Sequence, residues 1–208
     1  MTDTTPLVKQ LKAQLAAMQI TLANLEAALT PGPRALFCSP VTGQVETGSN
    51  PFGGDWFDAT GYAVSYITNG ARACHTGCDL NRPAYADAGA PVYAIADGEL
   101  VFFGTLPGWQ GMVLVLQHTL ENGSLIWTRY AHIQRANTLF AGELIKRGDL
   151  IGVIADYGAN GPPGDHLNFD IARIDLGRSP GDWPGQNLAR VQRDYIDPVV
   201  WLKNNLST

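Results

Sequence analysis

Three of the four histidines in the chain stand in short patterns that could support chemistry. His75 and Asp79 are spaced as H-x-x-x-D, and imidazole and carboxylate groups are both ordinary zinc ligands. His132 ends an apolar segment, while His166 and Asn168 would lie on one face of a strand, as a metal ligand and a base would need. Each pattern is weak when it is taken alone. The H-x-x-x-D spacing occurs by chance in many chains, and a histidine at a strand end is more often structural than catalytic.

These residues lie in a body that is predicted to consist of short strands. An Asp97-Gly98 turn joins two β-rich runs within residues 91–104, which predicts a β-hairpin. The last strand alternates, and its polar face carries His166, Asn168 and Asp170. That face is either solvated or the floor of a groove. This last strand spans residues 166–174, and the remaining predicted strands span residues 112–118, 124–132 and 150–154.

The composition favours a turn-rich β protein over a helical bundle. Of 208 residues, 45% are hydrophobic and 16% are charged, and there are 23 glycines and 13 prolines. The apolar fraction is enough to bury a core. The net charge of −5 disfavours a broad nucleic-acid-binding surface. No apolar run reaches the roughly 18 residues of a membrane span, so neither nucleic acid nor a membrane span is expected.

The N-terminal sequence has no basic segment followed by an apolar stretch, so no secretory signal peptide is predicted. We therefore expect synthesis in the cytoplasm. A protein that acts outside the cell would then have to be associated with a virion, carried by an injection or export machine, or released by lysis.

The cysteines are too few for a disulfide scaffold. Cys74 and Cys78 alternate with His75 and Asp79, so an extended backbone would point both thiols away from that pair. They are either small buried residues, or one of them pairs with Cys38.

The first segment, residues 1–33, is predicted to be an amphipathic helix that is separate from the β domain of residues 34–208. Apolar residues recur at alternating spacings of three and four within residues 6–29, which is a heptad seam. The helix either packs against its own β domain or self-associates as a coiled coil. The narrow seam favours a homo-oligomer.

Five motifs, taken in order, resemble the lysostaphin/LytM-type zinc endopeptidases, which are peptidoglycan hydrolases. The resemblance runs from about Phe57 to Leu176 and resumes at 195–202. It implies a mainly β fold, in which a twisted antiparallel sheet forms an open groove. The motifs are HxGxD, PVYAIADGELVFFG, YAH, GELIKRGDLIG and GDHLNFDI.

The resemblance also implies a role for each site residue. His75 and Asp79 match the first two zinc ligands, and His132 and His166 match the two catalytic histidines that do not bind the metal. The third ligand of the family is the second histidine of an HxH pair, and this chain has Asn168 there. A neutral amide oxygen suits calcium or magnesium better than zinc, so a weakened zinc site is expected.

Two functions follow from this departure. The first is a degenerate peptidase-like domain that binds peptidoglycan peptide or a protein partner in its groove, as a structural part of a phage or secretion particle. The alternative is an active zinc-dependent endopeptidase that cleaves wall cross-links.

A loop at 177–194 would narrow the groove, and Trp183 in it is expected to cap the core rather than the groove edge. His118 is expected to be structural.

Overall fold

The computed structural model describes residues 37–68, 70–83, 87–136, 138–156 and 165–206. The coiled coil predicted within residues 6–29 and the domain boundary predicted at 33/34 lie outside these ranges. Among the described residues, no helix has the length and apolar character needed to cross a membrane.

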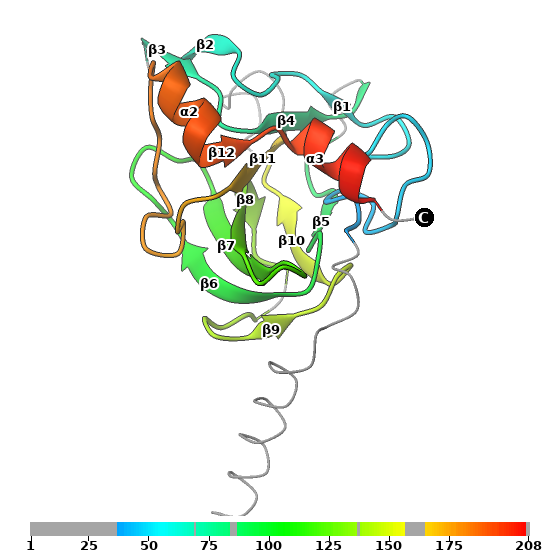
Figure 1. Ribbon diagram of the computed structural model, residues 1–208. Coiled ribbons are helices and arrows are strands. Elements are labelled where there is room, and N and C mark those ends of the chain that lie inside the picture. Colours follow the sequence, from blue (N-terminus) through cyan, green and yellow to red (C-terminus); the bar gives the residue numbers. More distant parts are fainter. Residues whose placement is uncertain (1–36, 69, 84–86, 137, 157–164, 207–208) are drawn as a thin grey trace, which may run out of the picture. The chain divides into compact units, whose positions relative to one another are not determined.

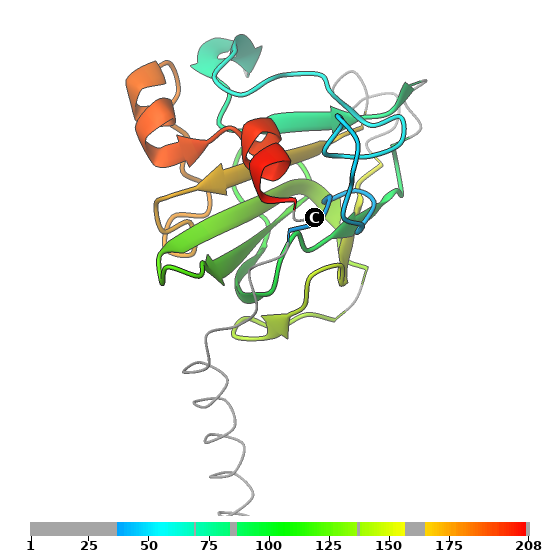
Figure 2. The ribbon, with the colours of Figure 1, turned by 45° about the vertical axis from the view of Figure 1, so that its right-hand side comes forward.

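The described chain is built around one large antiparallel sheet, which confirms the predicted fold class. Its main path runs in the order β1-β4-β11-β8-β7-β6-β9, and Figures 1 and 2 show β4, β11, β8 and β7 side by side. These strands are β1 (Phe57–Asp58), β4 (Cys78–Asn81), β6 (Gly98–Gly104), β7 (Met112–Thr119), β8 (Leu125–Gln134), β9 (Leu144–Ile145) and β11 (Leu167–Ala172).

Smaller elements complete the fold around this path. Strands β5 (Pro91–Tyr93) and β10 (Leu150–Ile154) pair with each other, and β12 (Tyr195–Ile196) pairs with β11. Strands β2 (Ser65–Thr68) and β3 (Ala71–Cys74) form a separate two-stranded sheet. Helices α2 (Leu188–Asp194) and α3 (Pro198–Asn205) follow the last long strand.

The hairpin predicted around Asp97-Gly98 is wrong. Strand β5 pairs with β10, while β6 pairs with β7 and β9. The linking residues are bonded elsewhere: Ala94 exchanges backbone hydrogen bonds with Gly148 and Asp149, and the Asp97 carboxylate accepts from the Arg147 backbone N–H. The Asp97-Gly98 sequence thus predicts a change of chain direction correctly, but the two strands that flank it do not pair with each other.

The alternation of β11 divides its side chains between two environments. Leu167, Phe169 and Ile171 are buried in the larger hydrophobic cluster. Asn168 and Asp170 point to the opposite face of the sheet, as the sequence predicts. The solvated alternative for this face is excluded, because Asn168 is only 4% exposed and Asp170 is fully buried.

The segment predicted as a loop at 177–194 has two parts. Residues 177–187 form turns, whereas Leu188–Asp194 form helix α2. The side chain of Asn187 caps this helix by accepting from the Arg190 backbone N–H.

Candidate metal centre

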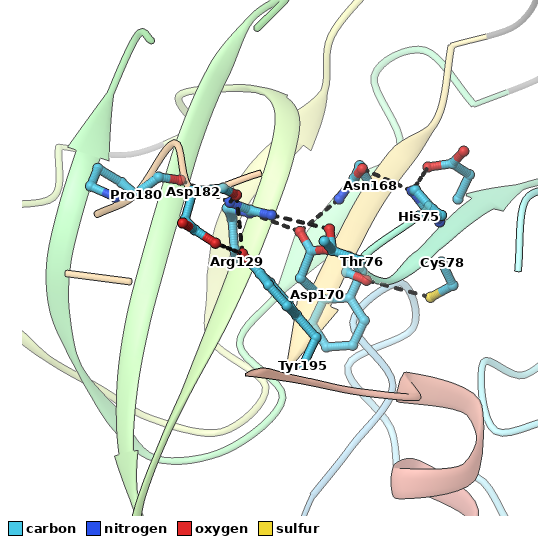
Figure 3. A network of polar contacts seen from close by, with 11 residues as sticks. His75, Thr76, Cys78, Arg129, Asn168, Asp170, Pro180, Asp182 and Tyr195 are labelled. Carbon is cyan, nitrogen blue, oxygen red and sulfur yellow. Dashed lines mark hydrogen bonds and ion pairs between the residues drawn. The ribbon is translucent and has the colours of Figure 1, made fainter. Parts of the chain in front are cut away.

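Strand pairing brings three polar side chains of the predicted site together. Asp79 on β4 and Asn168 on β11 are direct partners in the antiparallel ladder. His75 follows β3 and is 1% exposed. Its Nε2 lies 3.2 Å from Asp79 Oδ1 and 3.2 Å from Asn168 Oδ1 (Figure 3).

These separations suit a small metal ion. Zinc binds nitrogen and oxygen donors at about 2.0–2.2 Å, so adjacent donors of a tetrahedral site lie about 3.3 Å apart. Asp79 Oδ1 is buried and makes no hydrogen bond of good geometry to any described residue. A metal ion would satisfy this oxygen.

The third donor is the residue that departs from the usual ligand types. Among the described residues, no three His, Cys, Asp or Glu side chains are grouped so as to hold a metal ion. The set is therefore one imidazole, one carboxylate and the amide oxygen of Asn168.

The carboxylate of Asp79 keeps His75 protonated when no metal is bound. Burial lowers the pKa of His75, but contact with Asp79 and the charges of Asp79 and Asp170 outweigh it and raise the pKa to about 9. Burial would raise the pKa of Asp79, but His75 and His166 hold it below its ordinary value. At neutral pH, the protonated Nε2 of His75 therefore faces two acceptor oxygens, Asp79 Oδ1 and Asn168 Oδ1.

The two histidines implied to be catalytic lie beside these donors. The rings of His132 and His166 are 4.8 Å apart, and His166 Nε2 is 3.6 Å from Asp79 Oδ1. His132 Nδ1 is 2.9 Å from the Gln110 carbonyl, which only accepts, so Nδ1 carries the proton and Nε2 the lone pair. Burial, and then the charge of His166, lower the pKa of His132 to about 4.

A β-bulge positions His132. Met112 pairs with Ile133 and Val113 pairs with Ala131, so His132 is an extra residue in β8. Its φ of 63° is left-handed, a conformation that residues other than glycine seldom adopt. Bulges commonly redirect a side chain next to an active site, and this one accounts for the direction of the His132 ring.

A pocket of about 300 Å³ opens beside His132 and Asn168. Its walls are largely aromatic: Trp109 and Trp183 meet edge to face at 5.4 Å, and the Tyr66 ring lies 5.4 Å from the His75 ring. The lining residues are Tyr66, Thr68, Pro107, Gly108, Trp109, His132, Asn168, Gly181 and Trp183.

Trp183 therefore belongs to the pocket wall, and the expectation that it caps the core is wrong. Its ring contacts Tyr66, His75 and Trp109. Sequence reasoning also missed Tyr66 and Trp109, because neither stands in a motif with a metal ligand. Their place in the pocket wall depends on the tertiary fold, which brings their chain segments to the same face of the sheet.

The family can be identified from the sequence, independently of the geometry of the site. Residues 73–180, slightly more than half of the chain, match Peptidase family M23. The chain belongs to this family. The resemblance to the lysostaphin/LytM-type peptidases is thereby confirmed. No curated protein matches the chain.

Several solved structures are similar to this M23 domain, and two of them have a TM-score above 0.5. Lysostaphin from Staphylococcus simulans is 20% identical, with a TM-score of 0.53 over 83% of this chain and 56% of lysostaphin. CbpA from L. salivarius REN is also 20% identical, with a TM-score of 0.53 over 82% of this chain and 97% of CbpA. A zinc-containing peptidase from Vibrio cholerae is 27% identical, with a TM-score of 0.48 over 66% of this chain and 36% of that protein. The chain thus spans about half of lysostaphin and about a third of the Vibrio peptidase.

Cys38, Cys74 and Cys78 are free and buried, which excludes the predicted alternative of a Cys38 disulfide. Cys78 is directed at the Phe169 carbonyl, away from the donor atoms (Figure 3). Cys74 is directed at the Gln186 carbonyl. No thiol therefore takes the place of the third ligand.

His118 has the structural role expected of it. Its two ring nitrogens lie 2.8 Å from the Asp97 carbonyl and 2.8 Å from Thr128 Oγ1. Burial lowers the pKa of His118 to about 4, which keeps the ring neutral inside the core.

Proposed function

We propose that this M23 domain is a zinc-dependent peptidase that cleaves peptide cross-links of the bacterial cell wall. The observation that carries the proposal is the convergence of His75 Nε2, Asp79 Oδ1 and Asn168 Oδ1 at separations of 3.2 Å from the imidazole nitrogen. The same three residues would hold the metal ion. When bound, zinc supplies a Lewis acid for the scissile carbonyl and an acidified water.

The chain's own residues supply the proton transfers. His132 is neutral, and its Nδ1–H is held by Gln110, so Nε2 can take a proton from the attacking water. His166 lies 4.8 Å from the His132 ring, within reach of a second proton transfer.

Tyr66 would act on the carbonyl side of the reaction. Burial, followed by the charges of Asp79 and Asp170, raises the pKa of Tyr66, so its hydroxyl stays protonated. A neutral hydroxyl that lines the pocket can donate to the oxygen on which charge develops.

One observation favours a second candidate function. The described residues provide only two ligands of the usual zinc-binding types, and an amide oxygen is a weak third donor. A domain that holds little zinc would bind wall peptide or a protein partner in the same pocket without cleaving it. Such a domain would suit a structural component of a phage or secretion particle.

Metal content and wall lysis, measured on the same preparation, distinguish these functions. We expect close to one zinc per chain by elemental mass spectrometry, and clearing of purified cell walls that stops when a chelator is added. The His132→Ala variant should keep its zinc and lose the clearing. Folded protein with zinc but no wall-clearing activity, or folded protein with no metal, would favour the binding function instead.

A further inference from the structure

We propose that Asp170 is a positioning residue that fixes which end of the Asn168 amide faces the metal donors. The inference rests on the proposed function, because it concerns the same site. An asparagine amide has an oxygen that binds metals and an NH₂ group that cannot, and the two ends have nearly the same shape. A site that uses asparagine therefore needs a neighbour that selects the oxygen.

Asp170 is that neighbour. Its Oδ2 accepts a hydrogen bond of 2.8 Å from Asn168 Nδ2, and both side chains are buried. A carboxylate only accepts, so the NH₂ group must face Asp170 and the oxygen must face His75 (Figure 3). The reversed amide would set two acceptors against each other and its NH₂ group against His75.

Asp170 is itself held on several sides. Arg129 Nε donates to Oδ2 at 2.8 Å, and the Thr76 hydroxyl donates to Oδ1 at 2.5 Å. A β-carbon at Gly77 would lie 2.8 Å from Asp170 Oδ1 and 2.0 Å from the Phe169 carbonyl oxygen, so only glycine leaves room for this approach. The carboxylate therefore has little freedom to turn away from Asn168.

Arg129 extends this arrangement to the pocket wall. Its Nη1 donates to the carbonyls of Pro180 and Asp182, directly before Trp183. Its guanidinium also lies 4.6 Å from the centre of the Trp109 ring. One buried cation thus fixes Asp170 and the loop that bears Trp183.

The test removes the acceptor without leaving a buried charge unpaired. Arg129→Met combined with Asp170→Leu replaces an ion pair by apolar side chains of similar size, and it leaves the net charge of the chain unchanged. Arg129→Met combined with Asp170→Asn is the matched control, because it also removes the ion pair, while the amide oxygen at position 170 can still accept from Asn168. Both changes are made in the native chain and in Asn168→Ala, and zinc affinity is measured by competition with a chromophoric chelator.

We expect Arg129→Met with Asp170→Leu to weaken zinc binding about 10–100-fold when Asn168 is present, and by much less in Asn168→Ala. Arg129→Met with Asp170→Asn should keep most of the affinity. An equal loss with and without Asn168 would show that the ion pair acts only on the fold and would overturn the positioning role. If the native chain binds no zinc, the proposed function and this inference both fail. Zinc binding without the coupling to Asn168 would remove the inference alone.

A second measurement needs no change at the ion pair. In ¹⁵N-labelled, metal-free protein, the side-chain NH₂ of Asn168 should exchange slowly with solvent, because it is buried and donates to Asp170. It is assigned from its absence in Asn168→Ala. Exchange as fast as that of the exposed Asn122 side chain would contradict the fixed orientation.

Discussion

Asp79 and Asn168 face each other across the antiparallel pair of β4 and β11, although 88 residues separate them in the sequence. Successive side chains of a strand point to opposite faces, so a slip of one residue would move one of them to the core side. The pairing register of β4 and β11 is therefore as important to the site as the identity of the side chains.

A histidine at position 168 should strengthen the metal site. An imidazole is a better zinc ligand than a neutral amide oxygen, so we expect Asn168→His to raise zinc affinity at least about tenfold. Chelator competition measures the change. Asn122→His, at an exposed turn, is the control and should leave the affinity unaltered. An unchanged affinity in Asn168→His would mean that residue 168 does not contact the metal.

Zinc binding should strengthen as the pH rises. Metal and proton compete for His75 Nε2, whose pKa is raised to about 9. Below that pH, each unit of acidification should lower the apparent zinc affinity about tenfold. Titrations between pH 6 and pH 9 check the slope, and a flat profile would exclude His75 as a ligand.

The metal-free protein should show the opposite trend in stability. Because the folded pKa of His75 lies above its ordinary value of 6.5, the stabilisation from its proton is complete below pH 6.5 and is lost as the pH rises towards 9. Thermal unfolding in chelator should follow this direction, and His75→Gln should reduce the dependence.

Loss of His132 should separate catalysis from metal binding. The His132→Ala variant removes the proposed base and leaves the donors His75, Asp79 and Asn168 in place. We expect the rate of peptide cleavage to fall about 10²–10⁴-fold at unchanged zinc content. A His118→Ala variant, in contrast, should be less stable and should not lose activity selectively. Full activity in folded His132→Ala would rule out the proposed role.

Removal of the Trp183 side chain should relax the choice of substrate. This ring closes the pocket against Tyr66 and Trp109, so Trp183→Ala should favour peptides with larger side chains beside the scissile bond. The ratio of kcat/KM for leucine-containing over glycine-containing cross-link peptides should rise about tenfold. Trp201→Ala, which removes a ring packed on Phe37, should leave the ratio as it was.

Deletion of residues 1–34 should abolish oligomers and leave the M23 domain folded. The residues from Ala35 onward form a compact unit of their own. Light scattering gives the mass of each form, and circular dichroism checks the fold. Leu15→Glu with Leu22→Glu should act like the deletion, whereas Gln14→Glu should not. A full-length chain that is monomeric would disprove the coiled-coil oligomer.

Sequence motifs were enough to predict the residues that meet at the centre. His75, Asp79, His166 and Asn168 lie on strands or directly beside them, where a period of two residues fixes the face. The direction of His132 was beyond prediction, because it depends on a bulge that no residue type signals.

The pocket wall and the links between strands escaped prediction for a related reason. Trp109 and Trp183 reach the site through turns whose course depends on contacts with Arg129, far away in the sequence. The apparent hairpin at Asp97 was misjudged because the carboxylate bonds to the 146–149 turn, a contact between distant segments. Local patterns predicted the strands, and tertiary contacts decided their partners.

At His132, the left-handed backbone conformation disfavours a side chain, whereas the proposed role as a base requires an imidazole. This conformation costs about 1–2 kcal/mol for a side chain other than glycine, which is a noticeable share of the stability of a domain this size. Glycine would relieve this strain at an entropic cost of its own, whereas histidine keeps the hydrogen bond to Gln110 and the imidazole of the proposed base. In directed evolution, residue 132 would therefore report which of the two properties is being rewarded.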